Sequence, residues 1–225
     1  MTGEVHSHPT TIASRLTDDL TEAIVTGAIP AGQKISEPDL AKQYEVSRGP
    51  LREAIRRLEG RGLVQHIPHT GARVVTLALD EVVELYLVRE ALEGMATRLA
   101  AQHMSDEEIA AIRGLLDQHE KAVQRSEGRE YFQQEGDLDF HYRIVHASNN
   151  EKLISILGGE LYHLVRMYRY RSSLTASRPQ RALTEHRRIL DAIADRDGEL
   201  AEMLMRRHLA GARKSIAAQL DTSET

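Results

Sequence analysis

A segment with the pattern of a helix-turn-helix, residues 36–59, constrains the fold of this chain more than any other part. It reads as a short helix, a tight turn and a second helix, which Ser47 can cap by accepting a backbone N–H hydrogen bond. Apolar residues of the second helix recur at the spacing of one buried face. These residues are Leu51, Ala54, Ile55 and Leu58.

Arginines occupy the other faces of that second helix. They are Arg48, Arg52, Arg56 and Arg57. Guanidinium groups at the open end of a helix suit phosphates and guanine edges, so the pattern predicts a helix that reads DNA. A solvated charged face is the alternative interpretation. We favour DNA binding because the charge, the turn and the segment that follows agree with one another.

Two short apolar runs follow Gly62, over residues 63–67 and 72–75, and Pro68-His69-Thr70-Gly71 joins them. Apolar runs on either side of such a turn are typical of a β-hairpin. Gly71 would allow the backbone to lie close to a phosphate or to enter the minor groove. We therefore expect a wing beside the recognition helix.

The charge of the chain is divided unevenly along the sequence. The whole chain carries a net charge of −5, but residues 42–73 hold seven Lys and Arg against three Asp and Glu. Residues 79–225 hold twenty basic and twenty-five acidic residues. A basic first part on an acidic second part directs nucleic acid to one surface.

Length and composition indicate two domains and a reducing compartment. A chain of 225 residues that is 41% hydrophobic can bury one good core and a smaller satellite core. Cysteine is absent, which excludes disulfides and thiolate zinc clusters. No apolar run approaches the roughly 18 residues of a membrane span, and the first ten residues are polar. We expect a cytoplasmic protein that does not enter a membrane.

The helical period dominates the sequence beyond Leu77, which predicts a mainly α protein. We expect an N-terminal winged helix-turn-helix and a C-terminal all-α antiparallel helical bundle. The predicted divisions are a flexible N-terminus over residues 1–10, a DNA-binding domain over 11–78, a bundle over 79–220 and a tail over 221–225.

The first helix of the bundle should begin at a cap formed by Asp80. Its predicted buried stripe consists of Val83, Leu87, Ala91 and Met95. Later helices are expected over residues 129–147, 150–170, 178–195 and 198–220. No heptad or other dimer seam stands out.

Residues of the kind that bind metals lie on apolar helix faces of the bundle. Asp137 and His141 are four residues apart and would share a face, while His186 and His208 fall on the apolar stripes of two later helices. Such groups are costly to bury alone, and a divalent cation satisfies them together. Hydrogen-bonded core histidines are the alternative that the spacing leaves open.

The block from Ile12 to Leu77 resembles the winged helix of GntR-family bacterial regulators. The resemblance rests on the Ser-Arg-x-Pro-Leu-Arg-Glu-Ala sequence that begins at Ser47 and on the Gly-Leu-Val ahead of the wing. It implies that the start of the recognition helix and the tip of the wing face an operator. The DNA-binding residues expected from it are Arg48, Gly49, Arg52, Arg56, His69, Thr70 and Gly71.

The second part of the chain is similar to the FCD domain of the FadR-like branch of this family. The similarity rests on Asp137-Leu-Asp-Phe-His141, Ser148-Asn-Asn150, Glu185-His-Arg187 and His208. It implies a divalent metal held by Asp137, His141, His186 and His208. Zinc or nickel is expected first, with manganese, cobalt and iron also open, because imidazole and carboxylate ligands suit all five.

The same resemblance implies that the effector is a small organic acid. Arg89 falls in an Arg-x-x-Leu-Glu motif and could hold a carboxylate through two hydrogen bonds, and Asn150 could help to line the pocket. For Arg89, a surface salt bridge with Glu93 is the alternative interpretation.

Together these patterns predict a transcriptional regulator, most often a repressor in this family, and not an enzyme. A homodimer would place two recognition helices about 34–36 Å apart on a pseudo-palindromic operator in double-stranded DNA. Three alternatives stay open: a regulator that senses the metal itself, a purely structural metal, and a metal-dependent hydrolase. No glutamate is evidently positioned as the general base that a hydrolase requires.

Overall fold

The chain divides into two compact units, and the boundary between them in the sequence lies between Thr76 and Leu77. The computed structural model describes residues 11–126, 135–173 and 178–223. The flexible N-terminus expected over residues 1–10 lies outside the described residues. In the described part, no helix is both long and apolar enough to span a membrane.

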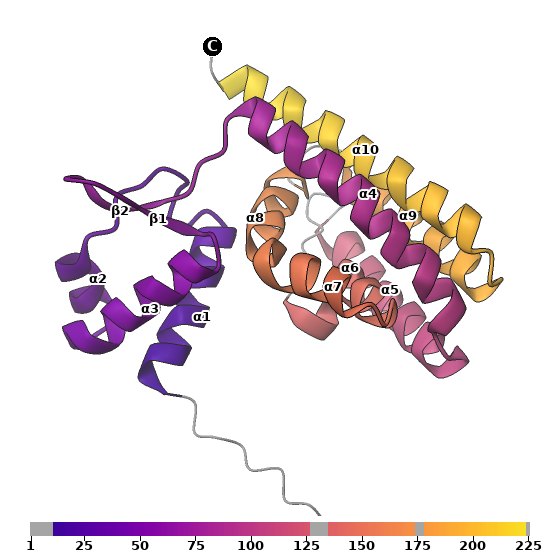
Figure 1. Cartoon of the computed structure of the whole chain (residues 1–225), viewed down its shortest axis with the longest axis horizontal. Helices are drawn as coiled ribbons and strands as arrows, with labels where there is room; N and C mark the ends of the chain where they lie inside the picture. Colours follow the sequence, from indigo (N-terminus) through magenta and orange to yellow (C-terminus); the bar gives the residue numbers. More distant parts are fainter. Residues whose placement is uncertain (1–10, 127–134, 174–177, 224–225) are drawn as a thin grey trace, which may run out of the picture. The chain divides into compact units, whose positions relative to one another are not determined.

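The first unit is a winged helix-turn-helix, as predicted. Its elements are α1 (Ile12–Val25), α2 (Glu37–Gln43), α3 (Arg48–Gly60), β1 (Val64–Ile67) and β2 (Gly71–Val74) (Figure 1). The apolar face of α3 packs against the apolar face of α1, and the side chains of both faces are buried. The buried side chains of α1 and α3 include Leu16, Leu20, Ile24, Leu51, Ala54, Ile55 and Leu58.

The turn before α3 differs from the expectation in one detail. Ser47 occupies the N-cap position with extended backbone, but its side chain makes no capping hydrogen bond within the described structure. The side chain is exposed, so water can satisfy the end of the helix instead. Glu45 has a φ of 53°, a left-handed conformation that allows the tight reversal between α2 and α3.

The wing is a two-stranded antiparallel hairpin. Val64 pairs with Val74 and Ile67 with Gly71. The turn is closed by a hydrogen bond from the Thr70 N–H to the Ile67 carbonyl, at 3.0 Å. Both His69 and Gly71 have positive φ, of 63° and 94°. Glycine adopts this conformation without strain, which explains its position where the second strand begins.

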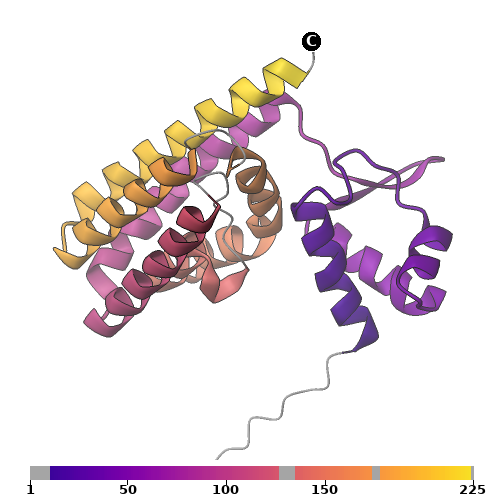
Figure 2. The same ribbon diagram turned by 180° about the vertical axis from the view of Figure 1, so that it is seen from behind.

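The second unit is the expected antiparallel helical bundle. Its long helices α4 (Leu79–His103) and α10 (Gly198–Ser223) lie side by side and run in opposite directions (Figures 1 and 2). The other helices are α5 (Asp106–Arg125), α6 (Phe140–Ala147), α7 (Glu151–Ser155), α8 (Tyr162–Ser173) and α9 (Arg178–Ala194). A 3₁₀ turn, η1 (Gly136–Leu138), precedes α6, and a π turn, η2 (Ile156–Glu160), links α7 to α8.

The main core of the bundle is formed by apolar side chains from α4, α5, α6, α9 and α10. Its fully buried members include Leu116, Phe140, Ile144, Ile189, Ile193, Met205 and Leu209. Three of the helices that contribute to this core, α6, α9 and α10, carry the three histidines singled out from the sequence.

Several predicted helix boundaries in the bundle are wrong. The helix expected from residue 129 is described only from Phe140, because Asp139 caps it by accepting hydrogen bonds from the N–H groups of His141 and Tyr142, at 2.9 and 3.3 Å. The helix expected over residues 150–170 is interrupted at η2, where Gly158 and Gly159 have low helix propensity.

Both ends of the long α4–α10 pair also differ from the prediction. Asp80 lies in the first turn of α4 and not at its cap, because the N-cap position is Ala78, whose N–H donates to Glu81 Oε2 at 2.7 Å. Helix α10 continues to Ser223, which extends it into the tail expected over residues 221–225.

The predicted buried stripe of α4 is also wrong. Leu87 and Met95 are 48% and 39% exposed, and Ala91 is exposed as well. The buried face instead carries Tyr86, Arg89 and Glu93 together with small and aliphatic residues. Two charged side chains that pair inside the protein therefore occupy the face that a hydrophobicity pattern assigns to solvent.

Candidate metal centre and nucleic-acid interface

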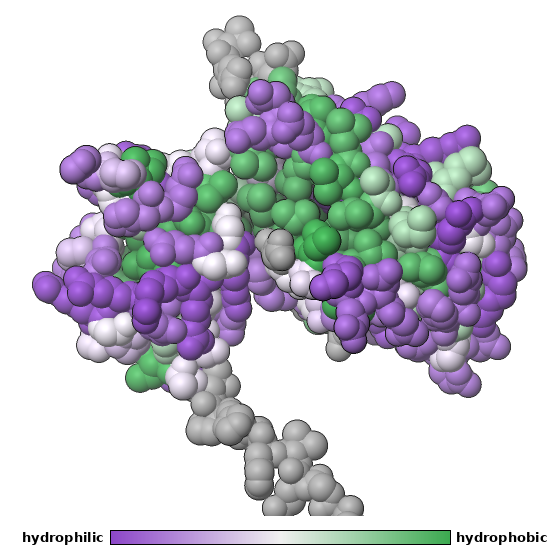
Figure 3. All heavy atoms as spheres, in the orientation of Figure 1, coloured by the Kyte–Doolittle hydropathy of each residue, from purple (hydrophilic) through white to green (hydrophobic). Residues whose placement is uncertain are grey.

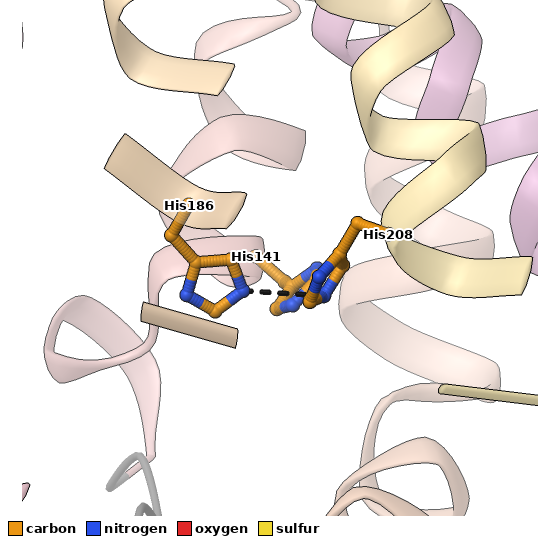
Figure 4. A group of neighbouring side chains, drawn as sticks. All are labelled: His141, His186 and His208. Atoms are coloured by element: carbon orange, nitrogen blue, oxygen red, sulfur yellow. Dashed lines mark hydrogen bonds between the residues drawn. The ribbon is translucent and has the colours of Figure 1, made fainter. Parts of the chain in front are cut away.

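Three buried histidines from three helices converge inside the bundle. His141 lies on α6, His186 on α9 and His208 on α10, and Figure 4 shows their rings turned toward one another. One ring nitrogen from each lies within 4.8 Å of the others. The Nε2 atoms of His186 and His208 are 3.2 Å apart. The structure thus brings together three of the four residues predicted to bind a metal.

Asp137, the fourth predicted ligand, is placed by its backbone in η1, and its side chain lies outside the described residues. The reasoning that Asp137 and His141 share one α-helical face is wrong, because α6 begins only at Phe140. Asp139 is the neighbouring carboxylate that is buried, and it is engaged by the capping bonds and by Arg169.

Two carboxylates fix the orientation of the histidine rings. Glu93 Oε2 lies 2.7 Å from His141 Nδ1, and Glu185 Oε2 lies 2.7 Å from His208 Nδ1. A carboxylate at Nδ1 holds the proton on that nitrogen and leaves Nε2 free to bind a cation. Sequence reasoning missed both roles, although Glu93 ends the Arg-x-x-Leu-Glu motif and Glu185 precedes His186.

The site keeps its imidazoles neutral and its carboxylates charged. Burial lowers the pKa of His141 and of His186. It lowers the pKa of His208 to about 3, against the opposing effect of the hydrogen bond that His208 donates to Glu185. Burial alone would raise the pKa of Glu93, but Arg89 and His141 outweigh it and hold that pKa well below its usual range. Neutral imidazole is the form that binds metals.

These observations fit a divalent cation. The three neutral imidazoles come from separate helices, and a carboxylate orients the rings of His141 and His208. Many zinc and other transition-metal sites have such a donor set. A hydrogen bond between His186 and His208 would account for two of the rings without a metal, but it leaves unexplained why His141 is turned toward the same point.

A small cavity of about 50 Å³ lies beside the histidines. Its charged and polar lining includes Tyr86, Arg89, Arg169 and Arg178 as well as the three histidines. Arg169 pairs with Asp139, and Arg178 pairs with Glu185 at 2.8 Å. Two of the three cavity arginines therefore have a carboxylate that engages their terminal nitrogens.

Arg89 is different, because its terminal nitrogens face no acceptor. It is fully buried and donates from Nε to Glu93 at 2.7 Å, so the pair predicted as a surface salt bridge exists but lies in the interior. Within the described structure, Nη1 and Nη2 of Arg89 and the Tyr86 hydroxyl have no hydrogen-bond partner. Buried polar groups without a partner are costly, so these three groups are available to a bound ligand or water.

Asn150 does not take part in this cavity. Its side-chain oxygen accepts from the N–H groups of Lys152 and Leu153, at 3.1 and 3.2 Å, and so caps α7. It is not among the residues that line the cavity in the described structure. The Ser-x-Asn element therefore has a local structural role in place of the expected ligand-binding role.

The first unit has an open groove between α3 and the wing. Gly49, Arg52 and Arg56 of α3 line it together with Gly71 of β2. Arg48 is exposed in the first turn of α3, while His69 and Thr70 form the turn of the wing. The predicted DNA-binding residues thus lie on α3 and the wing, and four of them share one groove.

The arginines of this unit fall into two groups. Arg52 pairs with Glu37 at 2.8 Å and Arg56 pairs with Glu53, and all of these exposed ion pairs are weak enough to be exchanged for phosphates. Arg61 instead binds Thr21 and Asp18 of α1, and Arg73 donates to the Gly32 carbonyl at 2.9 Å. The second group stabilises the domain itself.

The chain matches two family models that together cover both units. Residues 12–74 match the model described as bacterial regulatory proteins of the gntR family, and residues 84–211 match the model described as the FCD domain. These ranges include the groove arginines and all three histidines.

Full-length relatives agree with these matches. The Probable D-xylose utilization operon transcriptional repressor of Paenarthrobacter nicotinovorans is 34% identical over 89% of this chain and 87% of that protein. The HTH-type transcriptional repressor RspR of Escherichia coli strain K12 is 28% identical over 96% and 94%. A crystal structure of a GntR regulator from Rhodococcus sp. RHA1 superposes with a TM-score of 0.71, at 23% identity, over 92% of this chain and 97% of that one.

Proposed function

Because the chain belongs to the GntR family of bacterial transcriptional regulators and carries an FCD domain, we propose that it is a repressor whose operator binding is controlled by a small carboxylate. Its relatives are regulators of transcription, so the alternative of a metal-dependent hydrolase is set aside.

The proposed operator contacts come from α3 and the wing. Arg48 and Arg52 would bind guanine edges or phosphates from the start of α3, with Gly49 and Arg56 beside them. His69, Thr70 and Gly71 would follow the backbone or the minor groove. The proposal is supported by the exposure of these arginines and by the groove that Arg52 and Arg56 share with Gly71.

The proposed effector site is the cavity beside the histidines. A divalent metal, zinc or nickel first, would be held by His141, His186 and His208, with Asp137 as the fourth proposed ligand, and it would supply Lewis-acidic attraction for carboxylate oxygens. Arg89 would donate to the effector from Nη1 and Nη2 while Glu93 keeps its Nε.

One observation carries this proposal above the alternatives of a metal sensor or a structural metal. Arg89 is a fully buried guanidinium with two unpartnered nitrogens on a cavity that the histidines border. A site that senses or stores a metal alone gains nothing from a guanidinium with two unpartnered nitrogens near that metal. A site for a metal and an acid requires one.

Operator binding would be regulated through a difference in effector affinity between the DNA-free and DNA-bound arrangements. Two copies would present two recognition helices to a pseudo-palindromic operator, about 34–36 Å apart. The effector must then bind the two arrangements with different affinity, with a coupling of about 1–3 kcal/mol. The homodimer is part of this proposal.

A substitution of Arg89 tests the proposed effector site. Arg89→Lys keeps the charge beside Glu93 but removes the planar fork that binds a carboxylate through two bonds. The matched control is Arg188→Lys, an exposed arginine on α9. Zinc-loaded proteins would be mixed with lactate, gluconate, citrate and acetate, and melting temperature and operator affinity would be measured with each acid.

We expect at least one acid to raise the melting temperature and to change the operator affinity of the wild type and of the control. The same acid should do neither in Arg89→Lys. Equal stabilisation of Arg89→Lys by the acids would contradict the role of Arg89. Unchanged operator affinity under a saturating, stabilising acid would contradict regulation through this site.

A further inference from the structure

Helix α4 carries polar side chains on its inner face and apolar ones on its outer face. Tyr86, Arg89 and Glu93 are buried, whereas Val88 and Met95 are 44% and 39% exposed. Figure 3 shows hydrophobic side chains gathered in a band over this helix, with hydrophilic residues along its borders. An ordinary helix at a protein surface has the reverse arrangement. A buried polar face is costly unless its groups find hydrogen-bond partners.

The Tyr86 hydroxyl is a polar group of this face to which the proposed function gives no role. The side chain is fully buried and lines the cavity, and within the described structure its hydroxyl has no hydrogen-bond partner. The guanidinium carbon of Arg89 lies 4.7 Å from the centroid of the Tyr86 ring, so a cation–π contact holds the two side chains together. Phenylalanine would fill the same space and keep this contact. Packing alone therefore does not require the hydroxyl.

The hydroxyl is suited to bind an oxygen atom of a ligand. Burial raises the pKa of Tyr86 and outweighs the nearby arginines, which lower it, so the phenol stays protonated. A protonated phenol can donate one hydrogen bond and accept another. Nη1 and Nη2 of Arg89 already match the two oxygens of one carboxylate. The phenol is therefore left for a third oxygen of the same acid.

The size of the cavity limits the acid. At about 50 Å³ it has room for roughly three to five water-sized groups, since each needs about 10–15 Å³. This favours acids of a few carbon atoms over long acyl chains and sugar acids. Apolar side chains that suit a short carbon skeleton also line the cavity, namely Pro179, Ala182, Leu209 and Ala212.

The charged side chains of the cavity are balanced. Each of its three arginines pairs with one carboxylate, as Arg89–Glu93, Arg169–Asp139 and Arg178–Glu185. Burial keeps the three histidines neutral. The proposed divalent metal would add two positive charges, and Asp137 as its proposed ligand would offset one. A single carboxylate completes this balance, whereas a dicarboxylate or tricarboxylate exceeds it.

We propose that the Tyr86 hydroxyl sets the specificity of the effector site by binding an oxygen substituent next to the carboxylate, so that the effector is a short monocarboxylate with a hydroxyl or keto group. This inference rests on the proposed function for the carboxylate at Arg89. It adds the group that distinguishes one acid from another. An acid without the substituent would leave the phenol buried and unpartnered, which lowers its affinity.

Two acids of equal size test the role of the substituent. Glycolate and propionate have the same number of non-hydrogen atoms, and glycolate has a hydroxyl where propionate has a methyl group. Isothermal titration calorimetry would measure the affinity of each acid for the zinc-loaded full-length protein. We expect the wild type to bind glycolate about tenfold or more tightly than propionate, because propionate leaves the phenol unpartnered. Equal affinities would overturn the inference.

A variant without the hydroxyl assigns this preference to Tyr86. Tyr86→Phe should lose about tenfold or more in glycolate affinity and bind propionate at least as well as the wild type does. Any preference that comes from the metal is common to both proteins and remains. The matched control is Tyr142→Phe, at a partly buried tyrosine of α6 that is not among the described residues lining the cavity, and it should keep the wild-type preference. Without acid, Tyr86→Phe should melt no lower than the wild type, because the hydroxyl it removes has no partner in the described structure.

The outcomes separate this inference from the proposed function. If Tyr86→Phe keeps the full preference for glycolate, the role of Tyr86 is wrong, while loss of acid binding in Arg89→Lys can still bear out the effector site. A wild type that binds citrate or gluconate but neither short acid overturns this inference alone. If the wild type binds none of these acids, the proposed effector site is wrong as well. If Tyr86→Phe does not fold, the wild-type affinities for glycolate and propionate decide the question.

Discussion

Glu93 connects the proposed effector site with the proposed metal site. One of its oxygens accepts from Arg89 Nε at 2.7 Å, and the other lies 2.7 Å from His141 Nδ1. The same carboxylate therefore orients the guanidinium that would bind an acid and the imidazole that would bind a metal.

Replacing this carboxylate should weaken metal binding. Glu93→Gln removes the charge that fixes the tautomer of His141, and we expect a loss of about tenfold to a hundredfold in metal affinity. Competition with a chelator measures the affinity. Glu90→Gln, on the same helix but paired with Arg213 of α10, should bind metal as the wild type does. Equal affinity of both variants would show that Glu93 does not support His141.

The three histidines also predict how the metal-free protein responds to pH. Their ordinary pKa is 6.5, and burial lowers it in the folded protein, to about 3 for His208. Below pH 6.5 the unfolded chain therefore binds protons that the folded protein excludes, and folding becomes less favourable as pH falls. The window above pH 4.5 separates this effect from that of the carboxylates, because the pKa values of Glu93, Asp139 and Glu185 are lowered and their stabilisation is lost only in more acid solution. His119, whose pKa is also lowered by burial, acts in the same direction over this window.

Urea unfolding of chelator-treated protein at pH 7.5 and 5.5 measures this effect. Each histidine should contribute roughly 1 kcal/mol to the loss of stability on acidification. A His208→Gln variant, which cannot titrate at that position, should lose less than the wild type over the same interval. A wild-type free energy of unfolding that is level or rising toward pH 5.5 would show that the rings are not buried as neutral groups.

At the scale of the elements, the two units differ in how far the sequence predicted them. The helix-turn-helix and the wing follow local signals, such as the apolar period of α3 and the Pro68–Gly71 turn, and both were predicted correctly. In the bundle, burial is decided by contacts between distant segments. Local patterns therefore could not show that Arg89 and Glu93 occupy the inner face of α4, or that Leu87 and Met95 occupy the outer one.

The sequence predicted only part of the candidate site, because local patterns again do not reveal contacts between distant segments. His141, His186 and His208 lie on apolar stripes that are buried in the structure, so their convergence could be anticipated. The prediction that Asp137 and His141 share one helical face was wrong, because the chain before Phe140 forms a 3₁₀ turn and a cap. The orienting roles of Glu93 and Glu185 depend on pairing across helices, which spacing does not encode.

The division of arginines in the first unit yields a prediction for the recognition helix. Arg48→Ala and Arg52→Ala should each cost about 1–3 kcal/mol of specific operator binding and leave the melting temperature nearly unchanged. Arg73→Ala should lower the melting temperature instead, since it removes the hydrogen bond to the Gly32 carbonyl. Footprinting and thermal melts together distinguish the two kinds of arginine. Intact footprints for both Arg48→Ala and Arg52→Ala would overturn the assignment of α3.

At the scale of the whole molecule, one chain carries a winged helix-turn-helix unit and a proposed cavity for a metal and an acid. Helix α4 carries Arg89 and Glu93 on the inner face that borders this cavity, while Val88, Ala91 and Met95 are exposed on its outer face. An acid bound at Arg89 would therefore act directly on this helix.

The most direct test of the central claim is the metal content of the purified protein by plasma mass spectrometry, before and after dialysis against a chelator, with thermal melts of both samples. The account predicts about one tightly held divalent ion per chain and a lower melting temperature after its removal, because metal binding to the folded state stabilises that state. His186→Ala should lose both the metal and the stabilisation, whereas His103→Ala, an exposed histidine at the end of α4, should retain both. A protein that holds no metal, and whose melting temperature does not change when zinc or nickel is added, would contradict the account and make His141, His186 and His208 core residues.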